Sequence, residues 1–271
     1  MLGRLIKNEF KCNVHSVGLI YIVALACAGF MALAYLFKIT WISVLATIVL
    51  MFAGGAAIMV TLGCVVMNFQ KSLYRDQGYL SFTLPVTGTQ LLASKVICSF
   101  CWMLISYIVA LAIFVGVYLY SSAMVGDDMK MALDLLLSIF ADLPSKKVII
   151  EVIVIICLYV FLLMIVLIAE IYFSITVANT RMLQKMGVFS GIITFFVTFV
   201  AITAIAVFLT NKIPLTLVVT SNGLYYSTMA SMTKGTVGVQ FGLAGIIFFI
   251  AAAIGLFVGT EKLMGSKVNI K

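Results

Sequence analysis

Long apolar stretches separated by short polar segments dominate the sequence. A helix needs about 20 apolar residues to cross roughly 30 Å of hydrocarbon. Six stretches reach that length: Val17–Phe37, Ile42–Val66, Val96–Tyr120, Val148–Ala178, Val188–Leu209 and Phe241–Thr260. The three prolines all fall between these stretches, where they do not interrupt a helix. The pattern predicts a single-domain (1–271), all-α integral membrane protein with six transmembrane helices.

Composition and charge agree with this prediction. Hydrophobic residues make up 64% of the chain and charged residues only 10%, whereas soluble domains carry about 45–50% and 25%. Lys and Arg number 17 against 9 Asp and Glu. If both termini are cytoplasmic, eleven of the 17 basic residues lie in cytoplasmic segments, as the positive-inside rule favours. No basic run forms a patch for nucleic acid.

The first 16 residues form an amphipathic pattern. Leu2, Ile6 and Phe10 recur at a spacing of four, and basic residues such as Lys7 and Lys11 occupy the other side. A helix of this kind can lie in the cytoplasmic membrane interface. The alternative is a basic stub that only sets the orientation of the first span.

The segment Met67–Lys95, between the second and third spans, is the largest predicted cytoplasmic loop. Phe69 and Leu73 are four residues apart and share one face of a helix, and Gly78 offers a helix stop. These residues predict a short amphipathic helix that can dock on a cytoplasmic partner. Packing on lipid alone is the alternative.

Local signals mark a helix start and several close helix contacts. Thr87 or Thr89 can cap the helix that enters the third span. Small residues, which let helices approach closely, occur at Ala53–Ala57, Gly187–Gly191 and Gly255–Gly259.

Two segments lie on the predicted outer side. Ser121–Lys147 is acidic, with a helix expected around Met129–Phe140. Thr210–Gln240 is nearly uncharged and contains a turn signal at Asn222-Gly223. Its apolar piece Ile213–Val219 is too short to span but can dip into the outer leaflet as a re-entrant segment.

The sequence offers no catalytic or metal-binding constellation. His15 is the one histidine, which excludes sites that need two histidines within one chain. Cys98 and Cys101 form a lone C-x-x-C without a second ligand pair, so ordinary helix packing is favoured over zinc. No phosphate-binding loop is present, and Gly259 and Gly265 are spaced wrongly for one. We therefore expect no enzyme activity and no cofactor in this chain.

Two acids lie in the fourth span. Glu151 and Glu170 bracket eighteen apolar residues, about 27 Å of helix. Both carboxylates can then lie at interfacial depth as anchors. Alternatively, Glu170 is a functional intramembrane acid that handles a proton or substrate.

The loop before the third span resembles a known family. Residues 75–97, RDQGYLSFTLPVTGTQLLASKVI, are similar to the intracellular loop of small bacterial ABC transporter permeases of the type-2 exporter class. The family pattern is D-x-G-Y-L-x-F-T-L-P-V-x-x-x-Q-L-L-x-S-K. The matching residues are Asp76, Gly78, Tyr79, Leu80, Phe82, Thr83, Leu84, Pro85, Val86, Gln90, Leu91, Leu92, Ser94 and Lys95. Glu9-Phe10-Lys11, six spans and cytoplasmic termini also fit.

The resemblance implies roles for several segments. The N-terminal helix would be an interfacial elbow, residues 69–80 a coupling helix that contacts an ATPase, and Thr210–Gln240 partly re-entrant. The implied ATPase contacts are Phe69, Leu73, Asp76, Gly78, Tyr79 and Leu80. The implied assembly is two permeases, identical or different, with two cytoplasmic ATPases that bind ATP and Mg²⁺, in the bacterial cytoplasmic membrane.

The sequence therefore favours a permease subunit of an ABC exporter, with antimicrobial peptides or drugs as possible substrates. Two alternatives remain: a proton-coupled secondary transporter that uses Glu170, and a non-transporting membrane sensor or immunity protein.

Overall fold

The computed structural model describes residues 2–36, 40–74, 87–125, 146–180, 183–213, 215–220, 223–228 and 239–266. The predicted acidic-loop helix around 129–140 lies outside these ranges. Contacts group the chain into two units rather than one. The first is Met1–Leu133 with Ile270–Lys271, and the second is Asp134–Asn269.

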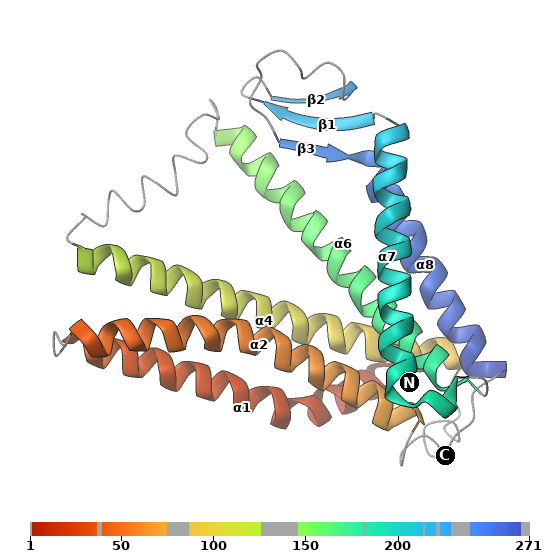
Figure 1. The fold of residues 1–271 in the computed structure, drawn as a ribbon, viewed down its shortest axis with the longest axis horizontal. Helices are drawn as coiled ribbons and strands as arrows, with labels where there is room; N and C mark the ends of the chain where they lie inside the picture. Colours follow the sequence, from red (N-terminus) through yellow and green to blue (C-terminus); the bar gives the residue numbers. More distant parts are fainter. Residues whose placement is uncertain are drawn as a thin grey trace. The chain divides into compact units, whose positions relative to one another are not determined.

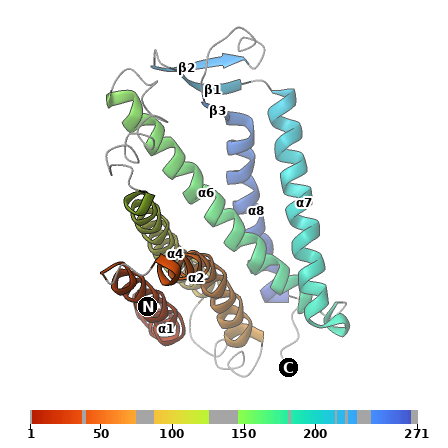
Figure 2. The same cartoon turned by 60° about the vertical axis from the view of Figure 1, so that its left-hand side comes forward.

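The first unit is a bundle of three long helices. They are α1 (Leu2–Leu36), α2 (Thr40–Tyr74) and α4 (Gly88–Val125). Each helix packs against the other two, and they lie side by side in both views (Figures 1 and 2). Gly54 of α2 allows one close approach, because a Cβ there would lie 3.3 Å from the Ile113 side chain of α4.

Helix α1 bends close to the predicted end of the amphipathic segment. Its parts Gly3–His15 and Val17–Leu33 meet at 43°. Ser16 lies at the bend and Gly18 shortly after it, and such small residues are common at helix kinks. Phe10 packs inward against the core of the unit, while Lys7 and Lys11 are exposed.

The second unit combines helices with a small sheet. Its helices are α6 (Lys146–Ala178), η1 (Gln184–Met186), α7 (Val188–Lys212) and α8 (Leu243–Ser266). Helices α6, α7 and α8 pack against one another. Glycines mark the close points: a Cβ at Gly191 would lie 3.5 Å from Ala178, and one at Gly259 would lie 3.2 Å from the Phe173 ring.

The three-stranded sheet was not expected. Strand β1 (Leu215–Thr220) lies between β2 (Gly223–Thr228) and β3 (Val239–Gly242), and both pairings are antiparallel. The sheet lies where α7 ends and α8 begins (Figure 1). The apolar piece expected at Ile213–Val219 thus contributes the central strand of this sheet, and its re-entry into the membrane stays a prediction. The expected turn is consistent with the register, which pairs Thr220 with Gly223.

The helices confirm the membrane class. Within the described ranges, five helices are long and apolar enough to span: Val44–Tyr74, Gly88–Tyr118, Ile150–Ala178, Phe189–Lys212 and Leu243–Met264. The bent pair in α1 makes a sixth if it is counted as one span. The chain is a multi-pass, predominantly helical membrane protein. It differs from the predicted all-α fold in containing the three-stranded sheet.

The two glycines of α8 provide a matched test of helix packing. A Cβ at Gly255 would meet nothing within 4 Å, whereas one at Gly259 meets Phe173. Alanine gains about 1 kcal/mol of helix propensity over glycine at either position, but the close contact offsets this gain at Gly259. We expect Gly255→Ala to raise the thermal unfolding midpoint in detergent and Gly259→Ala to leave it unchanged or lower it. Equal increases would show that Phe173 does not confine Gly259.

Candidate functional site

A charged cluster connects the three helices of the first unit. It consists of Glu9 from α1, Asn68 and Ser72 from α2, and Lys95 from α4, and we call it the Glu9–Lys95 cluster. Lys95 Nζ donates to Glu9 Oε1 and to Ser72 Oγ, each at 2.6 Å. Asn68 Nδ2 donates to Glu9 Oε2 at 3.0 Å. The Lys95 side chain is 2% exposed and that of Glu9 is 14% exposed.

The start of α4 positions Lys95. The Thr87 hydroxyl accepts a hydrogen bond from the Gln90 amide at 3.3 Å, which confirms the predicted cap. From there Leu91, Lys95 and Cys98 follow at helical spacing on one face, and all are buried. The ammonium group is thus carried inside the bundle by the same face that carries apolar residues.

Burial makes the hydrogen bonds of the cluster important. Removing a carboxylate and an ammonium from water is costly unless both are paired and hydrogen-bonded. Here Glu9 accepts one hydrogen bond on each oxygen, and Lys95 donates to two different helices. The cluster therefore holds the N-terminal segment of α1 against α2 and α4.

A neutral polar contact reinforces the same bundle further along. The Tyr21 hydroxyl of α1 and the Thr61 hydroxyl of α2 both lie 2.6 Å from Ser106 Oγ of α4. Between this contact and the Glu9–Lys95 cluster, Val17, Cys98 and Trp102 form a buried apolar layer. Cys98 accepts a hydrogen bond from Asn13 at 3.8 Å. Charged, apolar and neutral polar layers thus alternate along the three helices.

The residues expected to contact an ATPase divide into two groups. Phe69 and Leu73 continue helix α2, which runs unbroken to Tyr74, and they are 1% and 0% exposed. They therefore belong to α2 rather than to the separate short helix that we expected, and their side chains are buried in this structure. Their contact with an ATPase stays a prediction. Asp76, Gly78, Tyr79 and Leu80 lie outside the described residues.

A hydrogen bond joins the two helices that precede and follow residues 75–86. Ser72 lies shortly before residues 75–86 and Lys95 shortly after them, and the two side chains are hydrogen-bonded. This hydrogen bond therefore ties the last turn of α2 to the N-terminal part of α4. Glu9 ties α1 to Lys95 as well.

Glu170 occupies a different environment from the predicted interfacial anchor. It lies in α6, is only 2% exposed, and is followed by eight more residues of the same helix. Within the described part of the chain, no hydrogen bond or ion pair is found for its carboxyl group. Glu170 therefore remains a candidate functional intramembrane acid, as the sequence suggested. Its side chain faces protein rather than solvent.

Sequence reasoning missed the Glu9–Lys95 pair, although both residues belong to segments that carry the family resemblance. The available signal was a single lysine within an otherwise apolar stretch at the start of α4, and one acid in a basic N-terminal segment. The cluster offers no nucleophile or general base aimed at a cavity, so what it supports is mechanical coupling between helices. Comparisons with protein-family models, curated proteins and solved structures found no match for this chain.

Proposed function

We propose that this chain is the membrane-embedded permease subunit of an ABC exporter, with both termini in the cytoplasm of a bacterium. The observation that carries the proposal is the Ser72–Lys95 hydrogen bond, together with the Glu9–Lys95 ion pair. They join the helices that precede and follow the loop whose sequence resembles the family's ATPase-contacting segment. The bent N-terminal part of α1 would serve as the interfacial elbow.

The contacts between these helices suggest how force would reach the membrane. Cytoplasmic partner ATPases would bind ATP and Mg²⁺ and change their separation on hydrolysis. Movement of the loop between α2 and α4 would move α1, α2 and α4 together, because packed bundles shift as rigid bodies rather than deforming continuously. A second permease, identical or different, would complete the translocation pathway.

Docking on the partner provides the first test. We expect Tyr79→Ala to weaken pull-down of the proposed partner ATPase by about tenfold or more, since truncating a buried interface aromatic commonly costs 2 kcal/mol or more. Trp41→Ala is the matched control, because Trp41 is 86% exposed at the opposite end of α2. The purified chain alone should not hydrolyse ATP, and the complex should.

Two results would count against this proposal. One is robust ATP hydrolysis by the purified chain. The other is unchanged pull-down by Tyr79→Ala and by Gly78→Val, which replaces the predicted helix stop.

The buried Glu170 keeps a proton-coupled secondary transporter as a second candidate. Glutamine has the same shape as glutamate but carries no titratable proton. If the ABC proposal holds, Glu170→Gln should leave ATP hydrolysis by the reconstituted complex within about twofold, a change worth less than 0.5 kcal/mol. Glu151→Gln is the matched control from the other end of α6.

The alternative predicts a different outcome in proteoliposomes that contain the chain alone. Proton flux reported by an entrapped pH-sensitive dye, present in the wild type and abolished by Glu170→Gln, would favour the secondary transporter. The same flux in both proteins would leave no such role for Glu170.

A further inference from the structure

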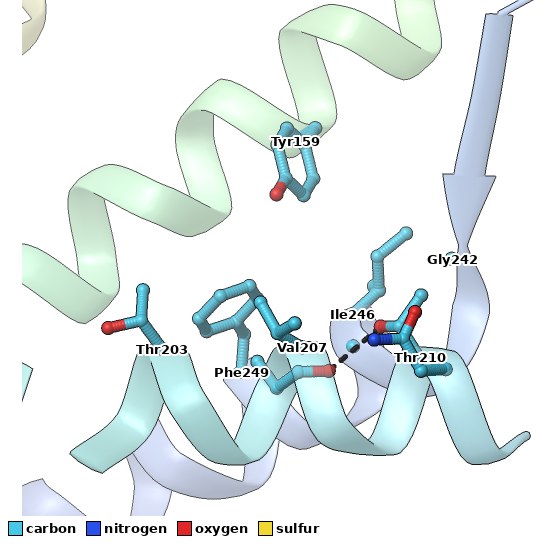
Figure 3. A pocket seen from close by; sticks show the side chains of 10 residues that line it. Tyr159, Thr203, Val207, Thr210, Gly242, Ile246 and Phe249 are labelled. Atoms are coloured by element: carbon cyan, nitrogen blue, oxygen red, sulfur yellow. Dashed lines mark hydrogen bonds between the residues drawn. The ribbon is translucent and has the colours of Figure 1, made fainter. Parts of the chain in front are cut away.

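The second unit contains a cavity of about 440 Å³ between α6, α7 and the start of α8 (Figure 3). This volume lies within the range of small-molecule sites, roughly 300–1,000 Å³. Its lining residues are Tyr159, Thr203, Ala206, Val207, Thr210, Asn211, Gly242, Gly245, Ile246 and Phe249. Figure 3 shows Tyr159 of α6 across the space from Thr203 and Phe249.

Among the described residues that line the cavity, none carries a charged side chain. The closest cation along α7 is Lys212, whose ammonium group lies 5.9 Å from the centre of the Phe208 ring. Lys212 and Phe208 fall on the face of α7 opposite to Ala206 and Thr210, because successive residues turn by about 100°. Carboxylates, phosphates and amines therefore have no counter-charge here, and an uncharged ligand is favoured.

The two threonine hydroxyl groups of the cavity offer acceptors rather than donors. Thr210 Oγ1 donates its proton to the Ala206 carbonyl at 2.9 Å. Thr203 Oγ1 donates to the Phe199 carbonyl one turn earlier. With these protons committed to the helix backbone, the lone pairs of both oxygens remain to accept a hydrogen bond. The two threonines therefore favour a ligand that carries a donor, which in an uncharged molecule is best supplied by a hydroxyl group.

The depth of the cavity matches one leaflet of a bilayer. Tyr159 is nine residues from the start of its span at Ile150, and Thr203 is nine residues from the end of its span at Lys212. Nine residues of helix cover about 14 Å, roughly half of the 30 Å hydrocarbon thickness. Both counts start from the sheet side of the unit, and Gly242 at the end of β3 lines the cavity there.

We propose that this cavity binds a neutral lipid alcohol from the leaflet on the sheet side. The lipid hydroxyl donates to Thr203 or Thr210, the exposed Asn211 amide contacts neighbouring ester or ether oxygens, and the hydrocarbon chain packs against Val207, Ile246 and Phe249. Gly242 and Gly245 allow the wall to close around Thr210, because a Cβ at either position would collide with the threonine side chain. The inference stands independently of the ABC proposal.

The test uses the full chain in phosphatidylcholine nanodiscs without any ATPase. Three photoactivatable probes with the same diazirine acyl chain are compared: a diacylglycerol, its hydroxyl methyl ether, and a free fatty acid. Labelled peptides are located by mass spectrometry. We expect the diacylglycerol to label residues 203–211 and 242–249 and unlabelled diacylglycerol to compete. Loss of the hydroxyl donor should lower labelling about tenfold, and the fatty acid should label equally weakly.

Two variants make the result specific. Ala206→Leu fills the cavity and should abolish labelling. Should that variant aggregate, the double variant Thr203→Val and Thr210→Val keeps side-chain volume but removes both acceptors, and should lower diacylglycerol labelling to the level of the methyl ether. Thr198→Val is the control, because Thr198 bonds to the Thr194 carbonyl outside the cavity.

Three outcomes would overturn the proposal. They are equal labelling by the alcohol and its methyl ether, equal labelling by the fatty acid, and labelling of the lipid-facing surface of α7 around Phe196 and Val200 that no cavity variant changes. Failure of the ATPase pull-down described above would leave this result untouched, since the nanodiscs contain no ATPase.

Discussion

Lys95→Met should destabilise the first unit by about 3–5 kcal/mol, the usual cost of breaking a buried ion pair by removing one partner. Methionine has a similar length and fills the space, so the loss comes from the charge rather than from a cavity. Glu9 would keep its hydrogen bond from Asn68 but lose the ammonium group that compensates its charge. Lys7→Met is the matched control, because Lys7 is exposed on the same helix as Glu9.

The pairing itself is tested by a double variant. Glu9→Gln combined with Lys95→Met leaves neither charge, and such replacements of buried pairs are often nearly neutral. We therefore expect the double variant to recover most of the stability that Lys95→Met loses, as measured by unfolding in mixed detergent micelles. If the double variant loses as much as the sum of the single variants, the two side chains do not interact in the folded protein.

Features set by local chemistry could be predicted from the sequence. The length of an apolar run fixes whether a helix can cross the membrane, so five of the six predicted spans overlap helices that are long and apolar enough to cross. The Thr87 cap depends only on a hydroxyl placed three residues before the Gln90 amide. Of the glycine motifs expected at close helix contacts, Gly54, Gly191 and Gly259 meet a neighbouring helix, whereas Gly55, Gly187 and Gly255 do not.

Features that depend on a partner distant in sequence could not be predicted. Glu9 and Lys95 are 86 residues apart. From the sequence alone, several other lysines and arginines near the same membrane face could equally well pair with Glu9. Only the packing of α1 on α4 selects Lys95. Likewise, the spacing of Phe69 and Leu73 shows that they share a face, but nothing in the spacing says whether protein, lipid or a partner covers it.

The sheet shows how one apolar run can support two predictions. Residues 215–220, LTLVVT, have the hydropathy of a membrane-dipping segment, and also the β-branched residues of a strand. A second such run at 223–228, separated by only two residues, was the sign of a hairpin. Strand pairing satisfies the backbone groups of both runs, which a lone short segment in hydrocarbon cannot do.

Because Leu73 is buried, placing a charge there should lower the stability of the protein by as much as the substitution of Lys95. Leu73→Asp should cost at least about 5 kcal/mol, because it removes a fully buried leucine and places a carboxylate without a counter-charge in its position. That cost is comparable with the whole stability of many domains. We therefore expect little monodisperse protein in fluorescence-detected size-exclusion chromatography.

Two controls at the same end of α2 separate packing from docking. Leu73→Met keeps the volume and should cost less than about 1.5 kcal/mol. Lys71→Asp introduces the same side chain at an exposed position two residues earlier and should cost about 1 kcal/mol or less. If instead Leu73→Asp folds as well as Lys71→Asp and loses only its ATPase, Leu73 faces the partner. The docking surface would then begin within α2, rather than beyond Tyr74 as our proposal expects for a buried Leu73.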